Sequence, residues 1–159
     1  MTTGSGTPRL TGIIPPPLAF IVLLAGGATA QYFYPVQLLT MPDTIRFLFA
    51  TLLSISSGCI ALAALAVMWK ARTDIGFRKP TTGIIMSGPF RFTRNPLYVS
   101  LLLLFGAVAF FFNSAWLTAF FALLFLFLNF KVITKEERYL DQCFGTEYLA
   151  YKNKVRRWL

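Results

Sequence analysis

Two polar clusters in the last third of the chain contain the residues whose types and spacing suit chemistry. Cluster 1, residues 88–98, has the sequence GPFRFTRNPLY, in which cations, an amide and aromatic rings stand among two prolines. Cluster 2, residues 136–151, opens with the adjacent carboxylates Glu136 and Glu137. Because each cluster lies at the mouth of a strongly apolar segment, we expect the two clusters to form two halves of one site.

Cluster 1 is suited to binding a polar or anionic group. Pro96 disfavours a helical conformation for the residue before it and fits the first turn of a helix, which makes Asn95 the expected N-cap. Backbone amides exposed at that helix start, with Arg94 nearby, would hold an anionic group, while Phe90 and Tyr98 offer aromatic faces. The structural alternative is an interfacial loop with a capped helix, its cations on lipid headgroups and Tyr98 in the aromatic belt.

Cluster 2 presents two carboxylates directly after an apolar segment. A carboxylate at the membrane surface is costly unless it is solvated or paired, which favours a role for Glu136 in binding hydroxyl or amine groups. Thr134 and Glu137 fit a capping box, in which Thr134 is the N-cap of a new helix and Glu137 reaches back to its amide. Tyr148 and Tyr151 recur at helical spacing and are expected to form a packing face.

The elements that must position these clusters are membrane helices. Of the 159 residues, 56% are hydrophobic and 13% are charged, which leaves too little polar surface to cover a soluble domain of this size. The chain is therefore predicted to be an all-α integral membrane protein. Four apolar segments approach the roughly 20 residues that a spanning helix needs, at residues 13–34, 45–69, 97–112 and 115–132.

The chain is expected to form one membrane domain. Asn113 and Ser114 separate the last two apolar segments, which predicts a tight helical hairpin; one helix over residues 97–132 would be about 54 Å long in a bilayer core of about 30 Å. Gly26 and Gly27 are expected to allow close helix packing. In chain order the predicted parts are an N-terminal tail (1–12), two spans (13–69), a loop with cluster 1 (70–96), the hairpin (97–132) and amphipathic C-terminal helices with cluster 2 (133–159).

The basic residues predict the orientation of the protein. Of 15 Lys and Arg residues, six lie between the second and third apolar segments and seven lie from Lys131 onward, whereas Arg46 lies near the opposite side. The positive-inside rule therefore places both termini and the 70–96 loop in the cytoplasm, with a bacterial inner membrane as the expected location. The formal net charge of +9 is explained by cations that flank spanning helices, so nucleic acid is not expected as a partner.

Several kinds of site are excluded by composition. The chain has no His, which excludes a His metal site, a Ser–His nucleophile and an imidazole base. Cys59 and Cys143 form no CxxC pair, so neither a metal site nor a disulfide is expected. Neither a GxGxxG motif nor a P-loop occurs.

The order of the two clusters, with an apolar hairpin between them, resembles the membrane methyltransferases related to isoprenylcysteine carboxyl methyltransferase. That group also resembles the phospholipid N-methyltransferases, and the resemblance covers about residues 68–159. It implies methyl transfer from S-adenosylmethionine to a lipid-like or amphiphilic acceptor, with S-adenosylhomocysteine as product. It also implies catalytic roles for Glu136 and Arg94. The cofactor contacts that it implies come from Thr82, Gly83, Ile84, Ile85, Phe90, Asn95, Pro96, Tyr98 and Glu136.

Two departures from that family bear on the acceptor. Asn95 stands where the eukaryotic prenylcysteine enzymes have His, and Val132 stands where they have a substrate-side Arg. Lys131 is the nearest cation, but a point charge lacks the planar fork of Arg, which argues against a prenylcysteine carboxylate. The acceptor, a carboxylate or an amine, is expected to enter from the bilayer between the second span and the hairpin. The alternative function is a non-catalytic membrane protein that binds a small ligand or a partner helix.

Overall fold

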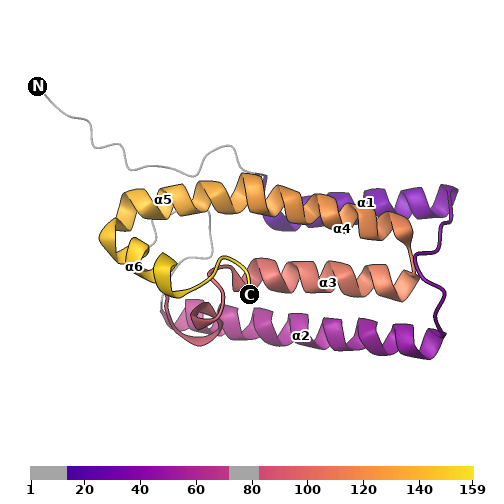
Figure 1. The fold of residues 1–159 in the computed structure, drawn as a ribbon, viewed down its shortest axis with the longest axis horizontal. Coiled ribbons are helices and arrows are strands. Elements are labelled where there is room, and N and C mark those ends of the chain that lie inside the picture. The colour runs from indigo at the N-terminus through magenta and orange to yellow at the C-terminus, as the bar shows by residue number, and fades with distance from the viewer. Residues whose placement is uncertain (1–13, 72–82) are drawn as a thin grey trace, which may run out of the picture.

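The computed structural model describes residues 14–71 and 83–159, and it is helical throughout these ranges apart from loops and two isolated β-bridges. The predicted all-α class is therefore confirmed for the described residues (Figure 1). The elements are α1 (Pro16–Phe33), α2 (Asp43–Lys70), the 3₁₀ turn η1 (Gly88–Arg91), α3 (Pro96–Phe112), α4 (Ala115–Phe127), the π-helical turn η2 (Leu128–Ile133), α5 (Thr134–Phe144) and α6 (Thr146–Lys154).

Within residues 14–71 and 83–159, three helices are long and apolar enough to cross a membrane. They are α1, α2 and the continuous helical rod of α4, η2 and α5, which runs over Ala115–Phe144. α3 is apolar but has 17 residues, the lower end of the usual range for a spanning helix. The chain is thus an integral membrane protein with three candidate spans, and the fourth span remains a prediction.

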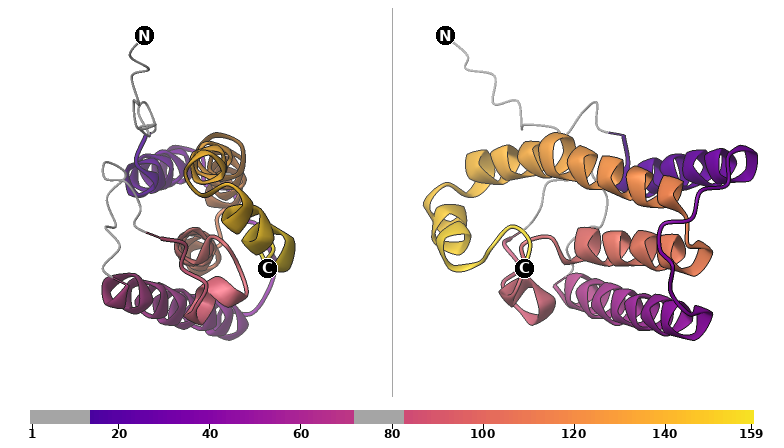
Figure 2. Two further views of the ribbon diagram at one scale, coloured as in Figure 1. Left: turned by 90° about the vertical axis from the view of Figure 1, so that its left-hand side faces the viewer. Right: turned by 45° about the vertical axis from the view of Figure 1, so that its right-hand side comes forward.

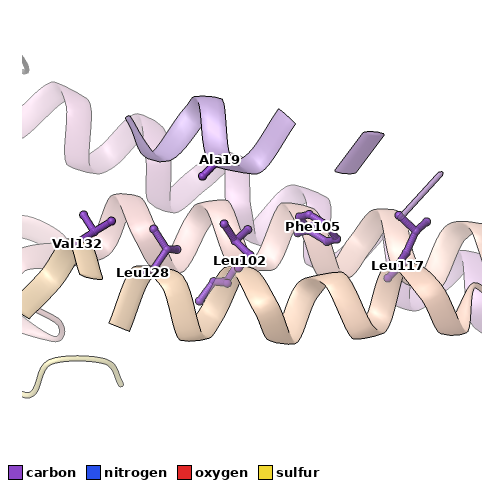
Figure 3. Close-up of a cluster of buried hydrophobic side chains, with 8 residues drawn as sticks. Ala19, Leu102, Phe105, Leu117, Leu128 and Val132 are labelled. Atoms are coloured by element: carbon purple, nitrogen blue, oxygen red, sulfur yellow. The ribbon is translucent and has the colours of Figure 1, made fainter. Parts of the chain in front are cut away.

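α3 occupies the middle of the bundle. It packs between α2 on one side and α4 on the other, and α1 packs against α4 (Figures 1 and 2). The buried core joins α1, α3, α4 and η2, where close packing of apolar side chains holds the helices together (Figure 3). Its labelled members are Ala19, Leu102, Phe105, Leu117, Leu128 and Val132.

The contact between α1 and α4 depends on two glycines. A Cβ atom added to Gly26 would lie 2.7 Å from Cε1 of Phe120, and one added to Gly27 would lie 2.8 Å from Cδ2 of Leu117. Real Cβ atoms do not approach side chains so closely, so the absence of a side chain lets the two helices meet. The predicted role of Gly26 and Gly27 in close packing is confirmed.

The end of the bundle between α3 and α4 is closed by polar contacts. Asn113 lies between these helices in the left-handed conformation (φ 47°), which Asn tolerates better than most residues. Its side chain accepts a hydrogen bond from the Leu39 amide (3.0 Å) and donates one to the Leu39 carbonyl (2.8 Å). Ser114 caps α4 by accepting from the Leu117 amide at 3.1 Å.

The predicted capping box at Thr134 is wrong. Thr134 has helical angles (φ −61°, ψ −36°), because η2 carries the helix from α4 into α5 without interruption. The Thr134 hydroxyl donates to the carbonyl of Asn129 at 3.0 Å, five residues back, and so turns toward the π turn. α5 begins at Thr134 as a continuation of the rod and not as a free helix end, and Glu137 therefore has no exposed helix start to cap.

The chain turns back at the other end of the rod. α5 ends at Gly145, and α6 runs back toward the start of α3 (Figures 1 and 2). Residues 155–159, which we call the return segment, then pass beside cluster 1, where Thr93 and Arg156 form a parallel β-bridge. The return segment and both polar clusters thus gather at one end of the bundle.

Candidate functional site at the start of α3

The start of α3 and the start of α5 meet through two side-chain contacts. The Tyr98 hydroxyl donates a hydrogen bond of 2.5 Å to Oε1 of Glu136. Nη1 of Arg94 lies 3.0 Å from Oε1 of Glu137. Two residues of cluster 1 therefore bind two consecutive carboxylates of cluster 2, and the clusters are in direct contact.

Glu137 is the centre of a buried ionic cluster. Its side chain is 8% exposed, and besides Arg94 it accepts from Nη2 of Arg157 at 2.5 Å and from Nε of Arg157 at 3.0 Å. A carboxylate this buried needs charged partners, and the forked guanidinium of Arg157 supplies two of its hydrogen bonds. Because the Arg94 side chain is only 9% exposed and pairs with Glu137, the alternative that Arg94 lies on lipid headgroups is wrong.

Arg94 retains a hydrogen-bond donor that is not used by the described residues. Its Nε is buried and has no hydrogen-bond partner in the described part of the chain, although Nη1 also donates to the Tyr148 hydroxyl at 3.4 Å. A buried cationic donor without an acceptor is expensive, so such a group is suited to binding an anionic ligand.

Two tyrosines of α6 contact cluster 1 through hydrogen bonds. Tyr151 donates to the carbonyl of Phe90 at 2.7 Å, and burial raises the pKa of its phenol to about 12. Burial, followed by the charge of Glu137, also raises the pKa of Tyr148. Both phenols therefore keep their protons at neutral pH. Both side chains are buried, which confirms the predicted packing face.

Asn95 and Pro96 lie where the sequence predicts, but the Asn95 side chain has another partner. Pro96 is the first residue of α3 and is buried, and Asn95 is its N-cap by position. The Asn95 side chain makes no capping hydrogen bond; its Nδ2 donates to the carbonyl of Arg157 at 2.9 Å. The Asn95 side chain, which we expected to cap α3, is thus bound to the return segment instead.

The turn before α3 is shaped by Gly88. This residue has φ +59°, and a Cβ atom there would lie 2.7 Å from Cγ2 of Val67 in α2, so a larger residue would be strained and would clash. Phe90 follows in η1 and is half-buried.

The remaining predicted residues precede that turn. Gly83, Ile84 and Ile85 are half-buried on an irregular segment, and no hydrogen bond joins them to the described Tyr98–Glu136 pair. Thr82 lies outside the described residues.

Sequence reasoning missed Asn129, Arg157 and Trp158. Oδ1 of Asn129 accepts from Nη1 of Arg157 (3.3 Å) and from Nε1 of Trp158 (3.1 Å). One signal was available, because a polar amide within an apolar helix is costly in a bilayer and indicates a partner. Arg157 carried no such signal, since it resembles the other cations that flank the spans.

The fold and the site define a class, a helical membrane protein with a buried polar site at the ends of its helices. The family model for phospholipid methyltransferase matches residues 45–147, and the chain belongs to that family. The match confirms the resemblance found in the sequence and indicates a membrane methyltransferase. It includes all four partners of the Tyr98–Glu136 and Arg94–Glu137 contacts, and it ends before the return segment.

A protein from Haemophilus influenzae is similar in sequence to part of this chain. The two are 43% identical over 65 residues, which are 40% of this chain and the whole of the relative, described as an uncharacterized protein. No solved structure matches this chain.

Proposed function

We propose that this protein transfers a methyl group from S-adenosylmethionine to a lipid-like or amphiphilic acceptor. The observation that carries the proposal is the Tyr98–Glu136 pair beside Arg94, whose buried Nε has no acceptor among the described residues. A carboxylate and a spare cationic donor suit a ligand that is itself both cationic and anionic.

The cofactor has such a pair of charges in its ammonium and carboxylate groups, together with a ribose diol, an adenine and a sulfonium. Glu136 can accept further hydrogen bonds besides the one from Tyr98, because a carboxylate has about four lone-pair sites. We assign it to the ammonium or the diol. Arg94 Nε is assigned to the cofactor carboxylate, and Phe90 offers an aromatic wall. The other proposed contacts come from Thr82, Gly83, Ile84, Ile85, Asn95, Pro96 and Tyr98.

The bound cofactor supplies an electrophilic methyl group, and the protein orients the acceptor in line with it and excludes water. We assign catalytic roles to Glu136 and Arg94, which fix the cofactor and thereby the direction of attack. A carboxylate acceptor needs no base. An amine acceptor must lose a proton, and Glu136 is the carboxylate at the site that is not bound by two guanidinium groups.

We assign the acceptor to the bilayer side of the site. The site lies at the end of α3 and of the apolar rod, so an apolar tail lying between α2 and these helices would present its polar head to the cofactor. Val132, which stands in place of the substrate-side Arg of the prenylcysteine enzymes, is fully buried in the core, and Lys131 is exposed. A prenylcysteine carboxylate would therefore lack an Arg fork at this position, and a different acceptor head is expected.

The test is binding followed by turnover with the full chain in detergent micelles. Isothermal titration of S-adenosylhomocysteine should give a micromolar Kd, and incubation with methyl-labelled S-adenosylmethionine and a total lipid extract should label a lipid. Binding without any labelled product would favour the alternative, a non-catalytic ligand-binding protein. Failure to bind either form of the cofactor would refute the proposal and would favour a membrane protein that binds another ligand or a partner helix.

A further inference from the structure

We infer that Arg157 is a positioning residue for the proposed cofactor site, acting through Glu137. In this inference, which rests on the proposed function, the return segment fixes α5 to cluster 1 and thereby sets Glu136 against Tyr98. The family match ends at residue 147, so the return segment contributes to the site from outside the matched region.

The first step is that the return segment binds cluster 1 through its backbone. The Arg94 amide donates to the carbonyl of Arg156 at 3.0 Å. The carbonyl of Arg157 accepts from the Thr93 hydroxyl (3.1 Å) and from Nδ2 of Asn95 (2.9 Å). Three consecutive residues of cluster 1 are therefore held by two consecutive carbonyls of the return segment.

The second step is that the side chains of the return segment bind the helical rod, whereas its backbone binds cluster 1. Arg157 contacts Glu137 through two nitrogens and Asn129 through the third. Trp158 donates to Asn129, and its ring packs on Phe125 with 5.2 Å between the centroids. The segment thus connects the two halves of the site, with its backbone on cluster 1 and its side chains on α4, η2 and α5.

The third step is the register that η2 creates. In a regular α-helix the step from Asn129 to Glu137 would be about 2.2 turns, which leaves the two residues roughly 80° apart around the axis. The π turn takes up one more residue, so that they lie about 20° apart. One Arg157 side chain can then reach both residues, and Glu136, the residue before Glu137, faces Tyr98 instead.

The fourth step is that α5 needs this connection. α5 projects beyond the start of α3, and its residue contacts with other elements are mainly with η2 and α6 (Figure 1). Polar side chains therefore set its orientation relative to cluster 1. Loss of the Arg157 fork would leave Glu137 with Arg94 as its charged partner and would free α5 to move Glu136 away from Tyr98.

The experiment is a double-mutant cycle on S-adenosylhomocysteine affinity, using the full chain in micelles at a temperature at which every variant is folded by circular dichroism. Arg157→Gln should weaken binding at least fivefold. Glu137→Gln should also weaken binding, and adding Arg157→Gln to it should change the Kd less than twofold, because Arg157 acts through Glu137. Arg156→Gln is the matched control: this exposed neighbour keeps its backbone carbonyl, and the Kd should stay within twofold.

Each outcome bears on one claim. If the unmodified protein does not bind, the proposed function fails, whereas binding that Arg157→Gln leaves unchanged overturns the positioning role alone. Fully additive losses in the cycle, or an equal loss in Arg156→Gln, would also overturn it, because Arg157 would then act independently of Glu137 or only by its charge. If Arg157→Gln does not fold, Arg157→Lys replaces it; a single amine cannot reproduce the fork, and at least a threefold loss is expected.

Discussion

Glu136 and Glu137 are adjacent in the sequence, but their side chains have different partners. Glu136 accepts from a neutral phenol, whereas Glu137 is buried between two guanidinium groups. Two buried charge pairs on Glu137 make it a structural anchor. Among the described residues, Glu136 accepts a hydrogen bond from one neutral partner, which leaves that carboxylate able to bind a ligand.

Glu136→Gln should weaken binding of S-adenosylhomocysteine by about 1–3 kcal/mol, the usual consequence of losing a charged hydrogen-bond acceptor. Tyr98→Phe keeps the ring and should weaken binding less, since it removes only the hydroxyl that orients Glu136. Isothermal titration would measure both. Affinities equal to that of the unmodified protein in both variants would contradict the assignment of Glu136 to the cofactor.

Glu137→Gln should lower the free energy of unfolding by about 3–5 kcal/mol, because it leaves two buried or half-buried guanidinium groups without their carboxylate. Unfolding in mixed micelles followed by circular dichroism would measure it. Glu147→Gln is the control, since Glu147 is exposed in the first turn of α6 and should change stability by less than about 1 kcal/mol. Equal stability of the two variants would refute the anchoring role of Glu137.

Among the elements, the two ends of the bundle are fixed in different ways. At the site, η2 sets the register of the rod and thereby which glutamate faces Tyr98 and which faces Arg157. At the opposite end, the Asn113 side chain fastens the loop after α1 to the connection between α3 and α4. At both ends, polar contacts orient the helices, because the hydrophobic effect that packs them is not directional.

Asn113→Ala should destabilise the protein more than Asn113→Gly. Both variants lose the two hydrogen bonds to Leu39, but Ala also pays about 1–2 kcal/mol for the left-handed conformation, which Gly adopts freely. Unfolding of the two variants in the same micelles would measure the difference. The reverse order of stability would show that backbone strain at residue 113 is unimportant.

For the whole molecule, the polar site and most of the cations lie at one end of the bundle. Lys131, Arg138, Arg156 and Lys154 are exposed there, beyond or beside the apolar part of the rod. The loop between α1 and α2 lies at the other end, with Arg46 paired to Asp43. This distribution favours a cytoplasmic site by the positive-inside rule.

Thiol labelling should test that orientation. In a background with Cys59→Ala and Cys143→Ser, Thr40→Cys should react with a membrane-impermeant maleimide in intact cells, whereas Glu147→Cys should react only after lysis. Both positions are exposed; Thr40 is in the loop between α1 and α2 and Glu147 is in α6, and these two elements lie at opposite ends of the bundle (Figure 1). Labelling in the reverse pattern would place the site on the outer face.

The sequence by itself determined the helical class, the bounds of α2 and α3 to within two residues, the close approach at Gly26–Gly27 and the meeting of the two clusters. These follow from hydropathy, from Pro and Gly and from short connections, all of which act locally along the chain. Local pattern also misled at Thr134, where a capping box matched but the helix continued through η2.

Only the tertiary structure decided which glutamate meets which partner and which residue completes the site. Those outcomes depend on the rotation of α5 about its axis and on the path of the return segment, which brings Arg157 within hydrogen-bond distance of Glu137, twenty residues earlier. A one-residue change of helical register rotates both side chains by about 100° and would place one glutamate on the face that the other now occupies. The preference for one register comes from the sum of long-range contacts with Arg94, Tyr98 and Arg157, which no local pattern contains.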